Sequence, residues 1–329
     1  MEVGLTLEHI REAHERIKDK ISRTPVMTSQ TLDSQASAQL FFKCENFQKT
    51  GSFKARGATH AVFCLPDAQA RNGVATHSSG NHGAALARAA QLRGVRAHVV
   101  MPTSAPRAKQ DAVKRYGGNI AFCEPTLEAR ERTLEQVIAG TGACLIHPYN
   151  DLRVMAGQGT AAVELIETVP DLDVILCPVG GGGLLSGVAV AARHMTPSIR
   201  VIGVEPAAAD DAARSFRSGR IVPSVDPTTI ADGLRASLGD RTFAEIRRYV
   251  DDIVTVPEAS IVAAMRRIWE IMKILVEPSA AVPYAAVADA SLDVRGQRVG
   301  IVVSGGNLDL DRLPWASAAG SIRTGPSGS

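Results

Sequence analysis

Four consecutive glycines, Gly180 to Gly183, follow the apolar run DVILCPV and precede a predicted helix that starts near Leu184. Such a loop leaves backbone N–H groups uncovered at a helix N-terminus, where they can bind a phosphate. A tight turn alone needs only one or two glycines. A dinucleotide site is the sharper alternative, because Glu205 ends the next apolar run, but Leu185 occupies the third glycine position of that fingerprint. The loop therefore predicts a site for a single phosphate.

Lys54 is the second residue that could do chemistry. It lies in the segment TGSFKARGA, shortly after the apolar run LFFKC and close to a predicted helix start. A lysine by itself is usually a solvated surface group. A cofactor with one phosphate and one aldehyde, however, needs both a phosphate site and an amine, and the chain offers both.

Hydroxyl, amide and imidazole groups follow the run GVATH, where Ser78, Ser79, Asn81 and His82 are predicted to lie at a helix N-terminus. The N–H groups of such a turn can bind a substrate carboxylate. An ordinary helix cap would use only one of these side chains. A serine hydrolase is a weaker alternative, because no G-x-S-x-G surrounds either serine. Ser304 ends the last apolar run before two glycines and by itself indicates only a cap.

Two acidic residues follow the run RVIGVE. Glu205 and Asp211 stand six residues apart across a predicted turn, and the carbonyl of Ala209 lies between them. Hard cations take such oxygen ligands, so a divalent metal is one interpretation. The alternative is that these carboxylates mark a helix start, where negative charge favours the helix dipole.

The elements that must position these residues are predicted from apolar runs that alternate with helical patterns. Continuous apolar runs are typical of parallel strands covered by helices on both faces, so we expect an α/β architecture with two doubly wound lobes. Ligands of such folds bind beyond the carboxyl ends of the strands. Residues Leu7 to Ile21 predict an opening amphipathic helix with Thr6 as its N-cap. The predicted strands are LFFKC, GVATH, AHVVM, NIAFC, ACLIH, DVILCPV, RVIGVE, DIVTV and QRVGIVV.

The bulk composition favours a small-molecule partner. The chain has 36 Lys and Arg against 34 Asp and Glu, so its charge gives no reason to expect nucleic acid or a membrane surface. The charged N-terminal segment resembles neither a secretory signal nor an anchor, and we expect a cytoplasmic protein. The five cysteines are widely spaced and are expected to be reduced core thiols.

Eight stretches resemble the fold-type II pyridoxal-phosphate enzymes, and within them the serine racemase and threonine/serine dehydratase group. They are FFKCENFQKTGSFKARGA, SSGNHGAALA, AGQGTAAVEL, PVGGGGLLSG, GVEPAAADD, TIADG, EPSAA and VVSGGN. The resemblance implies a two-lobed fold similar to the tryptophan synthase β subunit. We expect a small domain of residues 50–145 and a large cofactor-binding domain of residues 1–49 and 146–329. A homodimer is also expected.

The resemblance assigns the cofactor contacts. Lys54 would form the internal aldimine, Phe53 would lie against the cofactor ring and Asn81 would bond its phenolic oxygen. Ser304 would face the pyridine nitrogen, and its hydroxyl would keep that nitrogen largely neutral, which favours β-elimination. The phosphate would be held by Gly180, Gly181, Gly182, Gly183 and Leu184.

The resemblance also implies the substrate, base and metal residues. The substrate carboxylate would be bound by Ser78, Ser79, Asn81 and His82. Lys54 would take the Cα proton, and Ser79 matches the opposite-face acid/base of the racemases. Enzymes of this group bind magnesium or calcium through an E-P-x-x-A-D-D segment, which implies a site for Mg²⁺, Ca²⁺ or Mn²⁺ made by Glu205, Ala209 and Asp211.

Three functions stay open. The first is an ammonia-lyase acting on serine, threonine or 3-hydroxyaspartate, the second an amino-acid racemase with elimination as a side activity, and the third a non-catalytic phosphate- or nucleotide-binding α/β protein. Tyr149 departs from the racemase pattern, which has an asparagine there. Arg130 and Arg153 add positive charge that could bind the second carboxylate of 3-hydroxyaspartate.

Overall fold

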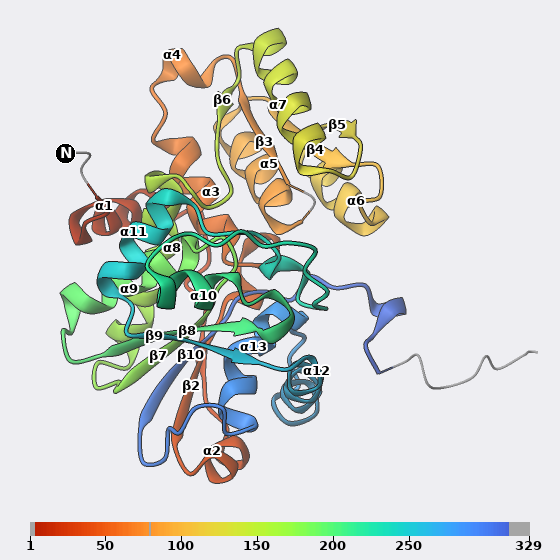
Figure 1. Cartoon of the computed structure of the whole chain (residues 1–329). Helices are drawn as coiled ribbons and strands as arrows, with labels where there is room; N and C mark the ends of the chain where they lie inside the picture. The colour runs from red at the N-terminus through yellow and green to blue at the C-terminus, as the bar shows by residue number, and fades with distance from the viewer. Residues whose placement is uncertain (1–3, 79, 316–329) are drawn as a thin grey trace, which may run out of the picture.

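The fold consists of two mainly parallel β-sheets with their covering helices (Figure 1). The computed structural model describes residues 4–78 and 80–315. A six-stranded sheet has the order β1 (Val26–Met27), β2 (Gln39–Cys44), β10 (Arg298–Val303), β7 (Val174–Pro178), β8 (Arg200–Pro206) and β9 (Asp252–Val256). A four-stranded sheet has the order β5 (Asn119–Cys123), β4 (Ala97–Pro102), β3 (Val74–His77) and β6 (Cys144–Leu145).

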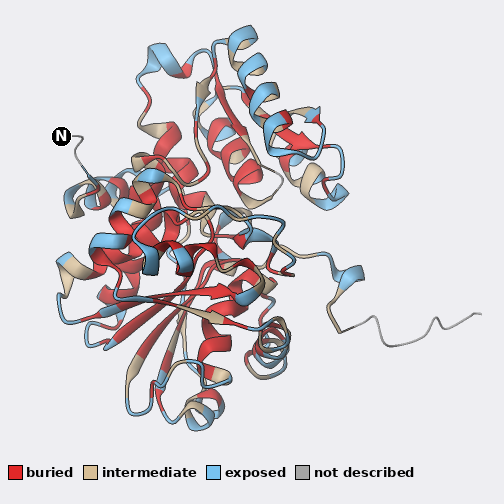
Figure 2. Ribbon diagram, viewed as in Figure 1, coloured by how far each residue is buried: buried red, intermediate tan, exposed pale blue. Residues whose placement is uncertain are grey.

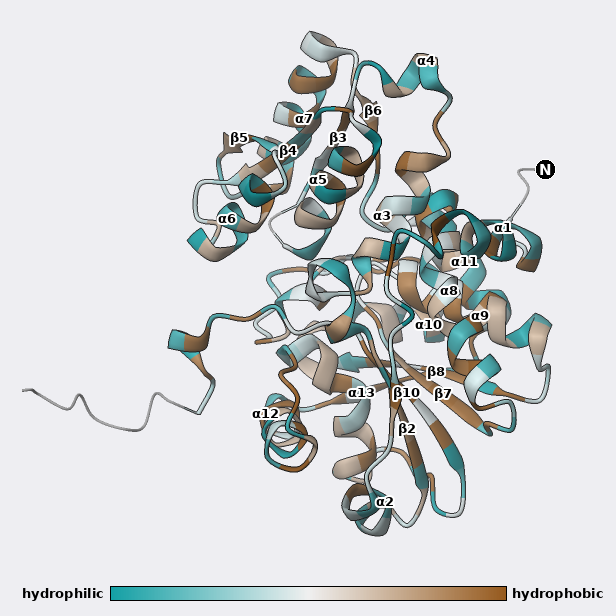
Figure 3. Ribbon diagram, turned by 180° about the vertical axis from the view of Figure 1, so that it is seen from behind, coloured by the Kyte–Doolittle hydropathy of each residue, from teal (hydrophilic) through white to brown (hydrophobic). Residues whose placement is uncertain are grey.

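Each of the nine predicted runs overlaps one of these strands, and all the pairings among them are parallel, as predicted. The additional strand, β1, pairs antiparallel with β2 and has only two residues, too few for a sequence pattern. Both faces of the six-stranded sheet are buried: Ile175 and Cys177 belong to one apolar core, and Val174 and Leu176 to the other. This explains the continuous apolar runs (Figures 2 and 3).

Helices cover both faces of the six-stranded sheet. α1 (Leu7–Ile17), α8 (Leu152–Thr168), α9 (Gly183–Met195), α10 (Asp211–Ser218) and α11 (Asp240–Tyr249) contribute to one core. The other core contains residues of α2 (Gln30–Ala36), α12 (Glu258–Arg267) and α13 (Pro278–Ala288). The four-stranded sheet packs against α5 (Asn81–Arg93), α6 (Arg107–Arg115) and α7 (Leu127–Thr141). The remaining α-helices are α3 (Lys54–Phe63) and α4 (Asp67–Ala70).

The opening helix is confirmed, with Thr6 accepting a hydrogen bond from the His9 backbone N–H as its N-cap. It ends at Ile17, four residues earlier than predicted. Ile21 is nevertheless buried, because a tight turn closed by a hydrogen bond from the Lys20 N–H to the Ile17 carbonyl returns the chain to the core. None of the described helices is long and apolar enough to cross a membrane.

Helix α8 packs closely between α3 and α9, and glycines make this approach possible. A Cβ on Gly157 of α8 would lie 2.6 Å from the Gly57 Cα of α3. A Cβ on Gly187 of α9 would lie 2.4 Å from the Met155 carbonyl oxygen of α8. Because α3 begins at Lys54 and α9 begins at Gly183, these contacts fix the distance between the lysine and the glycine loop.

Candidate active site

The predicted site residues follow the carboxyl ends of neighbouring parallel strands. The glycine loop follows β7, and Ser304 follows β10, the strand paired with both β7 and β2. The chain after β2 returns to the same place, because the Phe53 N–H donates to the Ser304 carbonyl at 3.0 Å. The structure therefore brings Lys54, the glycine loop and Ser304 to one edge of the six-stranded sheet.

The amine of Lys54 has few partners. Its Nζ donates to the Pro148 carbonyl at 2.9 Å and lies 5.0 Å from the centre of the Phe53 ring. Burial lowers the pKa of Lys54 to about 8, although the Glu277 carboxylate acts in the opposite direction. A larger neutral fraction makes this amine a better nucleophile and base near neutral pH, which fits the attachment of an aldehyde cofactor.

The glycine loop tolerates no side chains. A Cβ on Gly181 would lie 2.4 Å from the Tyr149 ring, one on Gly180 would lie 2.9 Å from the Leu234 Cα, and Gly182 has φ +88°. The backbone N–H groups of Gly180 to Gly183 have no protein hydrogen-bond partner among the described residues. The loop thus offers free donors at the start of α9, which fits a phosphate group.

Asn81 belongs to a partly buried network with Glu277 and Asn307. The Asn81 Nδ2 donates to both Glu277 oxygens at 3.0 and 3.2 Å, and its Oδ1 accepts from the Asn307 Nδ2 at 3.0 Å. Burial raises the pKa of Glu277 to about 7. Sequence reasoning gave no role to Glu277 or Asn307, although both lie in the matched stretches EPSAA and VVSGGN.

The predicted carboxylate loop lies at the N-terminus of α5. The Ser78 hydroxyl accepts hydrogen bonds from the Gly80 and Gly83 N–H groups, so this serine shapes the turn. The His82 Nε2 lies 3.4 Å from the Ile146 carbonyl, and its buried Nδ1 has no partner among the described residues. Ser79 lies outside the described residues.

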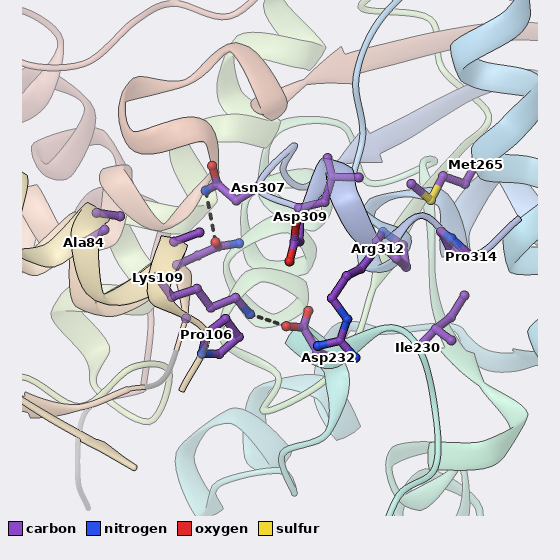
Figure 4. Close-up of a pocket in the computed structure, with 16 residues that line it drawn as sticks. Ala84, Pro106, Lys109, Ile230, Asp232, Met265, Asn307, Asp309, Arg312 and Pro314 are labelled. Atoms are coloured by element: carbon purple, nitrogen blue, oxygen red, sulfur yellow. Dashed lines mark hydrogen bonds and ion pairs between the residues drawn. The ribbon is translucent and has the colours of Figure 1, made fainter. Parts of the chain in front are cut away.

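A cavity of about 410 Å³ adjoins Asn81 on the side facing the C-terminal segment (Figure 4). Apolar side chains such as Ile230, Met265 and Leu308 line it. An ion pair between Lys109 of α6 and Asp232 crosses it (Figure 4). The cavity therefore lies between helices of the four-stranded sheet and segments that belong to the six-stranded sheet and its covering helices.

The predicted metal residues give a mixed result. The Glu205 carboxylate oxygens accept hydrogen bonds from the Ala212 and Ala213 N–H groups, both at 2.9 Å, as a helix-start charge does. Both oxygens of Asp211 are buried, and neither forms a hydrogen bond of good geometry with a described residue, although the nearby Ser224 side chain opposes the burial that raises the pKa of Asp211 to about 6. A hard cation would satisfy Asp211, and each Glu205 oxygen keeps a second lone pair for it. The described residues contain no group of three or more acidic, histidine or cysteine side chains that could hold a metal.

The two candidate arginines differ in their partners. Arg153 donates to both oxygens of Asp151, at 3.0 and 2.6 Å, so its charge is already paired. The buried Nε of Arg130 has no partner among the described residues. Burial is the main cause of a lowered pKa at His77, and the Arg130 charge adds to it. Arg130 belongs to α7, which packs against β3, the strand that ends just before the predicted carboxylate loop.

Comparisons with known proteins agree with this geometry. A family model described as pyridoxal-phosphate dependent enzyme matches residues 17–305. The chain is 53% identical over 310 residues to a β-hydroxyaspartate dehydratase of Paracoccus denitrificans, across 94% of this chain and 98% of that protein. A serine racemase of Arabidopsis thaliana is 51% identical, and the alignment covers 94% of each chain.

Solved structures show the same relationship. The structure of maize serine racemase superposes with a TM-score of 0.92 and 47% identity, covering 94% of this chain and 95% of that chain. A threonine deaminase from T.th. gives a TM-score of 0.88 at 42% identity, covering 92% of this chain and 99% of that chain. The predicted α/β fold of fold-type II is thereby confirmed. This chain belongs to the pyridoxal-phosphate dependent enzymes.

Proposed function

We propose that this chain is an ammonia-lyase that eliminates water from a β-hydroxy amino acid to give an enamine, which water then hydrolyses to a 2-oxo acid and ammonia. The observation that carries the proposal is the half-buried Lys54, with the pKa of its amine lowered to about 8, at the same sheet edge as a glycine loop with free N–H groups. The bound cofactor would supply the electron sink for the Cα carbanion.

The residues of the chain would bind the cofactor and the substrate and transfer the Cα proton. Lys54 would hold the cofactor and, once released from it, take the Cα proton. The glycine loop and Leu184 would bind the phosphate, Phe53 would lie against the ring, and Asn81 and Ser304 would contact its polar atoms. Ser78, Ser79, Asn81 and His82 would bind the substrate carboxylate. Family membership supports this function over a non-catalytic phosphate-binding protein.

Among the β-hydroxy amino acids we favour 3-hydroxyaspartate. Its second carboxylate needs a cationic partner, and Arg130 has a buried Nε without a partner among the described residues. The name of the dehydratase of Paracoccus denitrificans supports the same substrate. The names of the similar serine racemases support racemisation as a second activity.

A substrate panel tests the proposed function. We expect 2-oxo acid release from 3-hydroxyaspartate to exceed release from serine and threonine, with enantiomer inversion measured in the same reactions. Inversion without 2-oxo acid release would make the chain a racemase and refute the ammonia-lyase. Turnover of 3-hydroxyaspartate no better than that of threonine would refute the preferred substrate alone.

Replacing Arg130 by methionine is expected to lower kcat/KM for 3-hydroxyaspartate by roughly 10- to 100-fold, because one hydrogen-bonded charge contributes about 1.5–3 kcal/mol. Threonine has no second carboxylate, so its kcat/KM is expected to change by less than about twofold. The exposed Arg132, on the same helix, offers a matched control in Arg132→Met. An equal loss for both substrates would contradict the assignment of Arg130.

We also propose a structural divalent metal held by Glu205, Asp211 and the Ala209 carbonyl. A chelator is expected to lower activity and to reduce the melting temperature by roughly 5 °C, and Mg²⁺, Ca²⁺ or Mn²⁺ should restore both. Glu205→Ala with Asp211→Ala should remove this response, whereas Asp210→Asn, at a carboxylate paired with Arg214, should retain it. A double variant with wild-type stability, activity and chelator response would show that these carboxylates only start a helix.

The division into a small domain of residues 50–145 and a large domain, the homodimer and the cytoplasmic location stay predictions. The four-stranded sheet, built from β3 to β6, supports the small domain. Its proposed first helix, α3, packs against both α5 and α8.

A further inference from the structure

A buried network of four charged side chains lies behind the first turn of α3. Its members are no more than 2% exposed, and we call them the Arg56 network: Lys43, Glu45, Arg56 and Glu164. They come from β2, from the segment after β2, from α3 and from α8. The two positive and two negative charges balance, so the network is neutral as a unit. None of its members has a role in the proposed reaction.

Arg56 is the centre of this network. Its Nε and one terminal nitrogen donate to the two Glu45 oxygens at 2.7 and 2.8 Å. Its two terminal nitrogens donate to the two Glu164 oxygens, both at 2.7 Å, and one also donates to the Thr160 hydroxyl at 3.1 Å. These contacts use the planar fork of the guanidinium on both carboxylates. A lysine, which is a point charge, cannot reproduce them.

Arg56 and Lys54 lie on opposite sides of the same helix turn. Successive helical residues are about 100° apart, so positions two apart are separated by about 200°. With Arg56 held in the core, Lys54 is directed to the other side of α3, where its amine donates to the Pro148 carbonyl. The carboxylates that hold Arg56 belong to the chain after β2 and to α8, and α8 packs against α9, which begins at the glycine loop.

Stability alone is a poor explanation for the Arg56 network. Buried ion pairs lose about as much free energy by desolvation as they gain by attraction, and apolar replacements are often as stable. The two bidentate contacts of Arg56, which we call its double fork, instead fix the position and rotation of the helix that carries it. A displacement of about 1 Å at a reacting group can lower a rate by about 100-fold, so this fixed position matters for a lysine that transfers protons.

We propose that Arg56 is a positioning residue that sets the rotation of α3 and thereby places the Lys54 amine against the cofactor and the substrate Cα. The inference rests on the proposed role of Lys54. The carboxylates of Glu45 and Glu164 act together with Arg56 as the fixed points. Lys43 donates hydrogen bonds to the Thr24 carbonyl and to Glu164, and to no described residue of α3, so its charge balances the network without holding the helix directly.

The test compares Arg56→Lys with Lys43→Met in the holoenzyme. Arg56→Lys keeps the charge but loses the double fork, and we expect kcat to fall by roughly 10- to 100-fold with KM within about twofold. The pH midpoint of the visible absorbance of the lysine-bound cofactor is expected to shift, and hydrogen exchange in the first turn of α3 to increase. Lys43→Met removes a buried charge of the same network without touching α3. It should lower the melting temperature while kcat and the absorbance midpoint stay near the wild-type values.

The outcomes separate positioning from a structural role. A lower melting temperature in both variants, with kcat and the absorbance midpoint unchanged in Arg56→Lys, would overturn the proposal. If Arg56→Lys does not fold, Glu164→Asp keeps every charge but withdraws one carboxylate from the fork, and the same loss of kcat is expected. If Lys54→Ala keeps the absorbance band, the proposed role of Lys54 fails. Wild-type kinetics of Arg56→Lys, alongside a band that Lys54→Ala removes, would refute positioning alone.

Discussion

Replacing Lys54 by alanine is expected to abolish both elimination and racemisation and to remove the visible absorbance of the lysine-bound cofactor. The amine is the proposed attachment point of the cofactor and the proposed base for the Cα proton, so no activity should survive without it. We expect kcat/KM to fall by more than about a thousandfold, since removal of a covalent catalytic group usually costs at least that. Absorbance spectra and 2-oxo acid release measure the two effects.

Two other substitutions serve as comparisons for Lys54→Ala. Lys49 is an exposed neighbour in the same segment, so Lys49→Ala should keep the absorbance band. Ser79→Ala should remove racemisation but leave elimination of an L-substrate largely intact, because the two activities need opposite faces of the carbanion. If Ser79→Ala abolishes L-serine elimination while the cofactor stays bound, the assignment of the two faces is wrong.

Replacing Gly181 by alanine is expected to weaken cofactor binding by roughly 100-fold or more. The new Cβ would lie 2.4 Å from the Tyr149 ring, so either the ring or the loop must move. A displaced loop no longer directs its N–H groups at one phosphate, and each lost hydrogen bond to a charged group costs about 1.5–3 kcal/mol. Titration of the apoprotein with the cofactor, followed by absorbance, measures the dissociation constant.

The controls for Gly181→Ala are another glycine and the ring itself. A Cβ on Gly140, inside α7, would have nothing within 4 Å, so Gly140→Ala should leave cofactor binding unchanged. Adding Tyr149→Ala to Gly181→Ala removes the clash and should restore part of the affinity. Unchanged affinity in Gly181→Ala would contradict the phosphate assignment of the loop.

Much of the fold could be predicted because the buried strands leave a local signal. The strand in the run DVILCPV is apolar from Val174 onwards, because successive side chains point to opposite faces and each face meets an apolar core. Strand β1 has two residues and leaves no such pattern. The end of α1 depends on a tight turn, so the four residues after Ile17 resemble a continued helix in the sequence.

The candidate site could be predicted only where its residue types are unusual for their place. Four glycines after an apolar run indicate a phosphate loop. Together with that loop, Lys54 indicates a cofactor that carries one phosphate and one aldehyde. Glu277 is a single acid before a helix, and its contact with Asn81 joins residues 196 positions apart. The partners of Arg56 are spread over three other elements, so no spacing reveals them.

The sequence offered a helix start as one interpretation of Glu205, but only the structure shows the hydrogen bonds that support it. Its two hydrogen bonds to the N–H groups of α10 follow from where the helix begins, which sequence patterns place only approximately. The remaining argument for a cation is that the buried Asp211 oxygens lack a hydrogen bond of good geometry among the described residues.

The most direct test of the central claim is to locate the cofactor on the chain. The holoenzyme is reduced with borohydride, digested with a protease and analysed by mass spectrometry, so that the lysine bearing the pyridoxyl group is identified. We expect the group to lie on Lys54, in the peptide that contains GSFKARG. A group on any other lysine, or no covalent group in an enzyme that is active and contains the cofactor, would contradict it.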